Sequence, residues 1–272
     1  MPAIPATLGV VSTPPADPSA GSPAREATEQ DRVTAEILAA TSAPPLRGGH
    51  PDRAYGPYRS TALRAPTQPL VVASPSAVER TAPVFGPQDV APIDADLTIR
   101  STGEPLGERI VVTGRVLDAS GRPVRGQLVE VWQANAAGRY RHDGDLHPAP
   151  LDPHFFGGGR CLTDDDGRYR FVTIKPGAYP WRNHHNAWRP AHIHFSLFGT
   201  AFTQRLVTQM YFPGDQLFAL DPIFSSVTDE KAQQRMIARY DHDTTVAEWA
   251  LGYQWDIVLD GPGATPPDPD EV

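Results

Sequence analysis

The chain has little of several things that whole classes of protein need. It contains one cysteine, Cys161, in 272 residues. One cysteine excludes an internal disulfide framework, and it argues against a structural zinc site built from several thiolates. It is also typical of a reducing compartment, so we expect a cytoplasmic protein.

Long apolar runs and basic runs are lacking as well. No apolar run approaches the ~18 residues that suggest a membrane-spanning helix. The first residues, MPAIPATLGVVSTPP, have neither the basic region nor the long apolar region of a secretory signal. The formal net charge is −8, and lysines and arginines are not clustered. These features argue against a membrane or a nucleic acid as the main partner.

Proline, in contrast, is abundant, and it is concentrated at the two ends of the chain. The sequence holds 30 prolines, with eight in the first fifty residues and four in the last eleven. Residues 1–45 are therefore interpreted as a proline-rich, partly disordered N-terminal arm, with a short helix predicted over 23–43, and residues 262–272 as a disordered tail. Residues 46–105 are interpreted as an extended segment that packs on the core and on a partner chain.

Residues 106–261 are typical of a single β-sheet domain. Runs rich in β-forming residues are separated by clusters of Gly, Pro and Asp, and they cover residues 109–118, 126–134, 161–174, 191–199, 204–215 and 253–261. An Asp-Gly pair predicts a hairpin within 161–174, and Thr228 is the predicted N-cap of a helix over 228–241. The predicted fold class is all-β, an antiparallel β-sandwich with an irregular N-terminal arm and one or two short helices.

One stretch, YPWRNHHNAWRPAHIHF (179–195), is unusually rich in histidine and aromatic residues. On a strand, His192 and His194 place both imidazoles on one face and Ile193 on the other. A His-x-His pair alone is weak evidence for a metal, because an aromatic turn that leads into an ordinary strand also explains it. No Asp or Glu follows His194 until Asp215, which argues against iron held by two histidines and a carboxylate.

Two tyrosines extend this candidate set, Tyr140 and Tyr179. A phenol has a pKa near ~10 and is a poor ligand when neutral, but a trivalent hard cation stabilises the phenolate. Two phenolates with the imidazoles of His192 and His194 would suit Fe(III). Each tyrosine by itself is more often a core residue, so the prediction depends on the whole set.

The stretch VTGRVLDASGRPVRGQLVEVWQANAAGRY (112–140) resembles the signature of the intradiol ring-cleavage dioxygenases, which ends on a tyrosine that binds iron. The segments APLDPHFFGGGRCLTDDDGRYRFVTIKPGAYPWRN and NAWRPAHIHFS are similar to the same family. The resemblance runs from about residue 57 to residue 261, about three quarters of the chain. It implies a non-haem Fe(III) enzyme with one iron per chain, held by Tyr140, Tyr179, His192 and His194.

The resemblance also implies roles for residues around the iron. Tyr179 would be the axial ligand that is displaced by the catechol substrate and accepts one of its protons. Arg189 would stabilise negative charge on the ring during the reaction with O2. The substrate pocket would be completed by Gln209, Trp181, Ile223 and Tyr58.

Within the family, the chain resembles β-type chains that cleave protocatechuate (3,4-dihydroxybenzoate) to 3-carboxy-cis,cis-muconate in the β-ketoadipate pathway of aromatic catabolism. Such chains pair with a homologous α chain, so a hetero-oligomer is implied. Two alternatives stay open. The chain could be an intradiol dioxygenase for another catechol, such as catechol or hydroxyquinol, or a non-catalytic β-sandwich binding module whose histidines and tyrosines are structural.

Overall fold

The structure is a computed structural model that describes residues 90–181, 186–198 and 206–268. Tyr58, the helix predicted over 23–43 and most of the segment 46–105 lie outside the described residues. The N-terminal arm and the packing of residues 46–105 on a partner chain therefore stay predictions.

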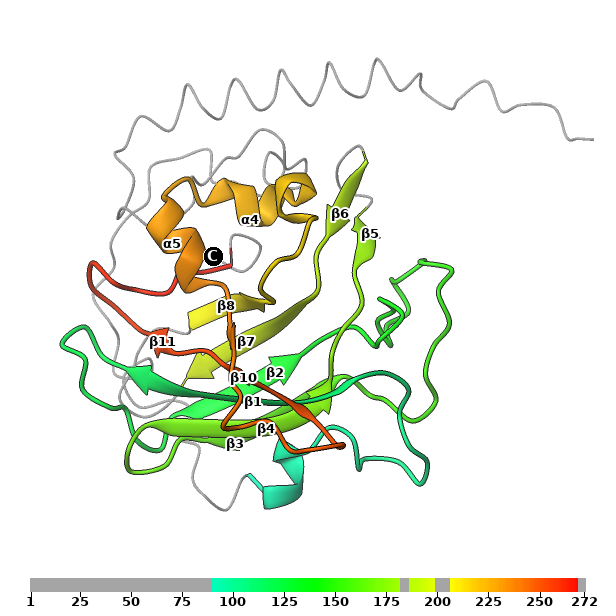
Figure 1. The fold of residues 1–272 in the computed structure, drawn as a ribbon, viewed down its shortest axis with the longest axis horizontal. Helices are drawn as coiled ribbons and strands as arrows, with labels where there is room; N and C mark the ends of the chain where they lie inside the picture. Colours follow the sequence, from blue (N-terminus) through cyan, green and yellow to red (C-terminus); the bar gives the residue numbers. More distant parts are fainter. Residues whose placement is uncertain (1–89, 182–185, 199–205, 269–272) are drawn as a thin grey trace, which may run out of the picture.

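Two β-sheets pack against each other around a shared apolar core (Figure 1). In the first sheet the strand order is β11-β1-β10-β9, with β4 also paired to β1, and in the second sheet it is β3-β2-β7-β8. The first sheet consists of β1 (Arg109–Leu117), β4 (Arg168–Ile174), β9 (Arg239–Tyr240), β10 (Leu251–Gln254) and β11 (Ile257–Val258). The second consists of β2 (Leu128–Trp132), β3 (Gly158–Leu162), β7 (His192–Phe198) and β8 (Leu206–Tyr211). The predicted all-β sandwich is confirmed.

The core forms because alternate side chains along a strand point to the same face of its sheet. Val112 of β1, Val131 of β2, and Ile193 and Phe195 of β7 are at most 3% exposed and belong to one cluster between the sheets. Each such side chain stabilises the fold by roughly 1.5–3 kcal/mol. The same alternation turns Trp132 and the β7 histidines to the opposite face of the second sheet, away from this core.

Strand pairing differs from the prediction in two respects. β1 pairs with β10 and with β11 in parallel, although its pairing with β4 is antiparallel as predicted. The hairpin predicted within 161–174 is wrong, because β3 pairs with β2 in the second sheet and β4 pairs with β1 in the first.

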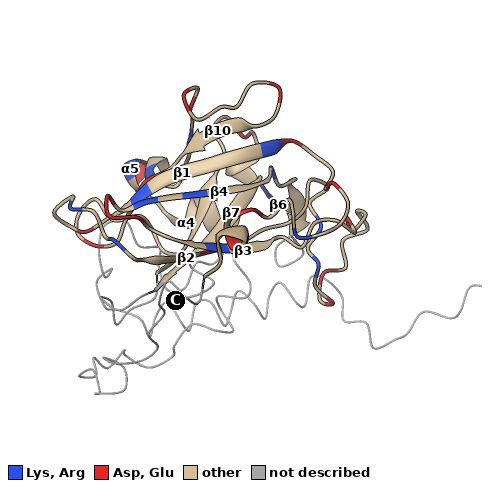
Figure 2. Cartoon of the chain, turned by 90° about the horizontal axis from the view of Figure 1, so that it is seen from below, with Lys and Arg blue, Asp and Glu red and all other residues tan. Residues whose placement is uncertain are grey.

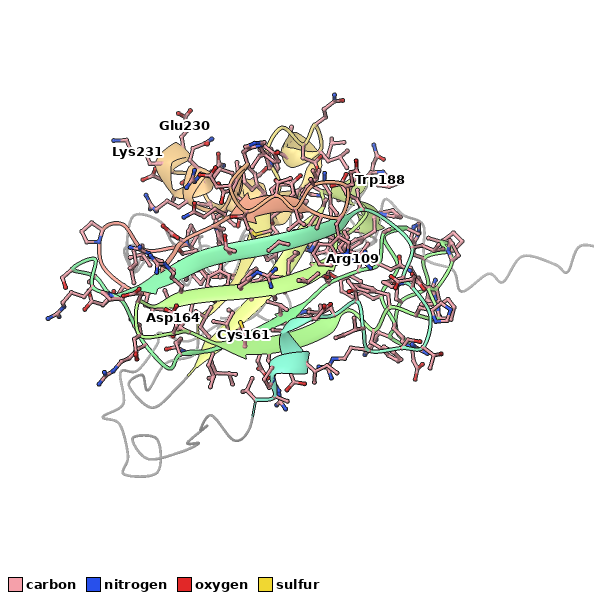
Figure 3. All side chains as sticks on the ribbon, turned by 60° about the horizontal axis from the view of Figure 1, so that its bottom comes forward. Arg109, Cys161, Asp164, Trp188, Glu230 and Lys231 are labelled. Atoms are coloured by element: carbon pink, nitrogen blue, oxygen red, sulfur yellow. The ribbon has the colours of Figure 1, made fainter. Side chains whose placement is uncertain are left out.

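The turn between β3 and β4 is nevertheless tight. Gly167 has a φ of 70° and donates its N–H to the Asp164 carbonyl at 3.0 Å, a conformation that glycine adopts without steric cost. Asp164 marks this turn at one end of the sheets (Figure 3). The Asp-Gly signal was therefore correct for the turn, but the strands on either side bury their side chains from opposite sheets.

Two short helices and a short strand pair cover the outer face of the second sheet. The helices are α4 (Pro222–Ser226) and α5 (Glu230–Arg235), which follow the 3-10 turn η3 (Phe218–Leu220), and the strands are β5 (Tyr179–Trp181) and β6 (Ala187–Arg189). Figure 1 shows both helices above β7 and β8. A second 3-10 turn, η2 (Pro92–Ala95), contacts β3 at the other side of the sandwich.

The helix predicted over 228–241 is shorter than expected. It begins at Glu230, because the Asp229 carboxylate, rather than Thr228, accepts hydrogen bonds from the amides of Lys231 and Ala232. Residues 239–240 already belong to β9. Glu230 and Lys231 point outward from α5 (Figure 3). None of the helices in the described ranges is long and apolar enough to cross a membrane.

The tail predicted to be disordered is ordered over residues 262–268. Pro266, Pro267 and Asp268 are buried. The Asp268 amide donates to the Val207 carbonyl at 2.7 Å, and the Thr208 hydroxyl donates to the Pro266 carbonyl at 2.7 Å. In Figure 1 this red segment returns from β11 and runs beneath α5. The prediction failed because proline removes amide donors without preventing an extended segment from packing beside a strand.

Candidate metal centre

The two histidines of β7 lie on the outer face of the second sheet, as their spacing predicted. His192 is opposite Tyr211 and His194 is opposite Gln209 in the pairing of β7 with β8, so the four side chains share one face. The centroids of the two imidazole rings are 4.9 Å apart. Ile193, between them, faces the core and is fully buried.

A tight turn after β2 brings Tyr140 to this face. The Asn135 side-chain oxygen accepts hydrogen bonds from the amides of Ala137 and Arg139, both at 2.9 Å. Gly138 has a φ of 75°, and a Cβ there would lie 2.2 Å from the Ala178 carbonyl oxygen. Only glycine therefore allows the turn to approach the residue that precedes Tyr179.

Tyr179 is positioned by the β5–β6 ladder, in which it is the partner of Arg189. The Tyr179 hydroxyl is 3.3 Å from Nε2 of His192. The Tyr140 ring lies 5.5 Å from the Tyr179 ring, with an interplanar angle of 85°, and 6.4 Å from the His194 ring. Three segments that are distant in sequence thus bring two phenols and two imidazoles together.

His192 has the protonation that a metal ligand needs. Its Nδ1 is 2.7 Å from the Pro190 carbonyl, which can only accept, so Nδ1 carries the hydrogen and Nε2 keeps its lone pair toward Tyr179. Burial, together with the charge of Arg189, lowers the pKa of His192 well below 6.5. The imidazole is therefore neutral near pH 7.

Burial disfavours the charged phenolate form of both Tyr140 and Tyr179. Burial raises the pKa of Tyr140 well above 10, and the neighbouring Tyr179 raises it further. Burial also raises the pKa of Tyr179. The Tyr179 hydroxyl is close enough to Tyr140 to affect its pKa, but no partner of the Tyr140 hydroxyl among the described residues has good hydrogen-bond geometry.

A hard trivalent cation would change this balance, because it stabilises the phenolate form directly. In the part of the chain that the structure describes, no group of three or more His, Cys, Asp or Glu side chains is placed to hold a metal. The side chains that the structure brings together here are the phenols of Tyr140 and Tyr179 and the imidazoles of His192 and His194. This set fits Fe(III), since it offers two anionic oxygens to a hard cation.

Arg189 supplies a permanent positive charge beside these four side chains. Its guanidinium is buried, with Nε 3.0 Å from an Asp221 carboxylate oxygen, and Nη2 donates to the Gln209 side-chain oxygen and to the Tyr211 hydroxyl. Burial lowers the pKa of Arg189, but Asp221 and the nearby phenols raise it, and the net effect is a pKa well above the usual value for arginine. The cation is therefore retained although it is almost inaccessible to water.

The remaining predicted pocket residues lie around Arg189. The Trp181 ring centroid is 5.9 Å from the guanidinium carbon. Ile223 is fully buried on α4, and its amide donates to Asp221, the ion-pair partner of Arg189, at 3.0 Å. Tyr58 lies outside the described residues.

Four residues of this region were not predicted: Trp132, Tyr211, Asp221 and Asp268. The Trp132 ring stacks on His194, with centroids 4.8 Å apart and an interplanar angle of 7°. On β2, Val131 faces the core, so its neighbour Trp132 faces the site. On β8, Tyr211 is two residues after Gln209 and shares its face. Strand alternation could therefore have predicted both positions. Asp221 and Asp268 carry no local signal, since both come from irregular segments.

Comparison with known proteins identifies relatives over most of the chain. The family model described as Dioxygenase matches residues 80–261, and the one described as the protocatechuate 3,4-dioxygenase beta subunit N terminal matches residues 43–76. The protocatechuate 3,4-dioxygenase beta chain of Burkholderia cepacia is 62% identical over 219 residues, which are 80% of this chain and 93% of that one.

More distant relatives match the middle of the chain. Hydroxyquinol 1,2-dioxygenase of Rhizobium sp. (strain MTP-10005) is 34% identical over 52% of this chain and 50% of its own length. The protocatechuate 3,4-dioxygenase alpha chain of Pseudomonas putida is 33% identical over 58% of this chain and 75% of its own. One family model matches residues 80–261, and a 62% identical relative covers 80% of this chain. This chain therefore belongs to the intradiol ring-cleavage dioxygenase family.

Proposed function

We propose that this chain is the catalytic β chain of a protocatechuate 3,4-dioxygenase. The enzyme cleaves the carbon–carbon bond between the two hydroxyl-bearing carbons of protocatechuate. Both atoms of O2 enter the product, 3-carboxy-cis,cis-muconate, and this is a step of the β-ketoadipate pathway. The observation that carries the proposal is the convergence of two buried phenols and two imidazoles beside a buried arginine cation.

Tyr140, Tyr179, His192 and His194 would hold one non-haem Fe(III) per chain. When bound there, Fe(III) would supply Lewis-acid chemistry that makes a catechol ring reactive toward O2. The chain contributes two imidazoles, of which burial keeps that of His192 neutral, and two phenols that would ionise in the field of the cation. The buried Tyr140 hydroxyl, which has no hydrogen-bond partner within the described ranges, supports this assignment.

The two tyrosines differ in how firmly they are held. The Tyr140 amide donates to the Asp145 carboxylate at 2.8 Å, and the preceding turn is fixed by Asn135 and Gly138. Tyr179 lies in the short β5–β6 ladder, where it pairs with Arg189. As the family resemblance implies, we assign the displaceable position to Tyr179, whose phenolate oxygen would accept a proton from a catechol hydroxyl as the substrate binds.

Arg189 would stabilise negative charge that develops on the substrate during ring cleavage. Because Asp221, Gln209 and Tyr211 hold the guanidinium in place, it needs no reorganisation at the moment of reaction. Gln209 would contribute by holding the Arg189 guanidinium in this orientation. Trp181, Ile223 and Tyr58 would form the apolar wall that keeps water from the ring.

We also propose a homologous α chain as the partner. The α chain of the Pseudomonas putida enzyme is itself a relative of this chain, and residues 43–76 match an N-terminal family named for β subunits. The same N-terminal match and the 62% identical β chain favour protocatechuate over catechol or hydroxyquinol as the substrate.

The test is a visible spectrum with iron analysis of the purified protein, followed by protocatechuate under anaerobic conditions. Ferric phenolate absorption should give a red protein with about one iron per chain, and substrate should move the band to longer wavelength. Admission of O2 should then yield 3-carboxy-cis,cis-muconate. A colourless, iron-free protein that does not bind protocatechuate would instead favour the non-catalytic binding module.

A further inference from the structure

The C-terminal segment that follows β11 is fixed to the fold by several hydrogen bonds. The Thr265 amide donates to the Val258 carbonyl at 2.9 Å, and the Val258 amide donates back to the Thr265 hydroxyl at 3.0 Å. The Arg235 Nε donates to the Ala264 carbonyl at 3.0 Å. Together with the contacts of Pro266 and Asp268 to β8, these bonds fix the path of the segment.

This path ends beside the candidate metal centre. Asp268 is 1% exposed, although it lies close to the end of the chain. One oxygen of its carboxylate is 3.4 Å from Nδ1 of His194 and accepts a hydrogen bond from Nε2 of Gln209. A carboxylate this deeply buried is rare unless it is paired with other groups.

We propose that Asp268 is a positioning residue for the metal centre, and that the C-terminal segment exists in part to deliver it there. This inference rests on the proposed function. A carboxylate can only accept hydrogen bonds. His194 can carry its hydrogen on either ring nitrogen, and the Gln209 amide can be turned either way. Because Asp268 lies beside both, it determines which form each side chain takes.

The first of these side chains is His194. An acceptor beside Nδ1 favours the tautomer with hydrogen on Nδ1, which leaves the Nε2 lone pair for a metal. His192 has the equivalent arrangement with the Pro190 carbonyl at 2.7 Å. The 3.4 Å between Asp268 and His194 exceeds an ordinary hydrogen bond, so the effect is mainly electrostatic, and the stacked Trp132 ring holds the imidazole plane on its other side.

The second side chain is Gln209. Arg189 can only donate, so it requires the Gln209 oxygen, and Asp268 can only accept, so it requires the Gln209 nitrogen. The amide therefore connects the guanidinium to the carboxylate in one fixed orientation. Through this connection Asp268 supports a ligand, His194, and the cation of Arg189 at the same time.

The experiment compares iron retention in full-length Asp268→Asn with the wild-type chain. Asparagine has the same shape but no charge, and we expect iron affinity to fall about 10- to 100-fold, the usual effect of losing a partner of a metal ligand. The measurement is competition with a chelator, followed by the ferric phenolate absorbance. Asp268→Glu keeps the charge and should recover most of the lost affinity, and Asp260→Asn, an exposed carboxylate of the same segment, should match the wild type.

Thermal unfolding of the iron-free proteins separates positioning from general support of the fold. Iron affinity of Asp268→Asn within about threefold of the wild type overturns the proposal while leaving the metal centre intact. Equal loss of affinity in Asp268→Asn and Asp268→Glu, together with equal loss of iron-free stability, also overturns it, because the role would then be structural. A wild-type chain that binds no iron overturns the proposed metal centre itself.

Discussion

The two sheets bury the same kind of apolar side chains between them, but their outer faces differ in character. On the first sheet, Arg115, Arg168 and Arg170 are exposed, and Figure 2 shows basic residues along β1 and β4. On the second sheet, the polar side chains His192 and Gln209 are at most 2% exposed. They are covered by β5, β6, α4 and the C-terminal segment.

Burial beneath other elements, rather than residue type, gives these polar side chains their chemical capacity. The exposed arginines of the first sheet are screened by water and salt, so their interactions are weak. Arg189 has the same guanidinium, but in a medium of low dielectric its charge acts strongly on its neighbours. Burial also keeps His192 neutral.

The largest expected effect is the loss of a ligand on the covered face. His192→Ala and His194→Ala should each lose iron, colour and ring-cleavage activity, because each removes one of four protein ligands. Iron analysis and the visible spectrum provide the measurement, and Arg115→Ala, at an exposed position of the first sheet, is the control. Stoichiometric iron in either histidine variant would mean that the ligands are wrongly assigned.

A smaller but still large effect is expected when the buried cation is removed. Arg189→Ala should destabilise the iron-free protein by about 3–5 kcal/mol, because it leaves the Asp221 carboxylate buried and unpaired. Arg115→Ala should change stability by no more than about 0.5 kcal/mol. Urea unfolding measures both, and similar effects of the two substitutions would contradict the difference between the faces.

The two tyrosines allow a comparison within the covered face itself. Tyr179→His should still bind iron but should bind protocatechuate at least about tenfold more slowly, because the new neutral ligand cannot take the catechol proton as the phenolate does. Tyr140→His should alter the iron spectrum with and without substrate, since that phenolate stays bound. Anaerobic stopped-flow mixing distinguishes them, and equal slowing in both variants would show that the displaceable position belongs to neither tyrosine alone.

The smallest effect is expected inside the sandwich. Cys161 is a buried free thiol on β3, and burial raises its pKa to about 12, so it carries no thiolate near pH 7. Cys161→Ser should leave the turnover rate within about twofold and lower stability by about 1–3 kcal/mol, because a hydroxyl replaces a thiol in apolar surroundings. A large loss of activity in a variant of unchanged stability would reveal a reactive role for the thiol.

Local pattern was enough to predict much of this protein. Alternation along 191–199 predicted β7 and the shared face of His192 and His194, because side-chain direction on a strand depends only on the spacing of residues. The Asp-Gly pair correctly predicted a turn at Gly167 for the same local reason. Residues 112–140 and 179–195 carried the family resemblance, and with it the candidate ligands.

The amino-acid pattern alone therefore predicts local features: which segments form strands, which side chains share a face, and which residue types could hold a hard cation. The placement of β3 and β4 in different sheets, and the approach of Asp221 and Asp268 to the site from irregular segments, depend on the three-dimensional fold. Those contacts join residues far apart in the chain. They form because packing buries apolar surface across the whole fold and then requires each buried polar group to find a partner.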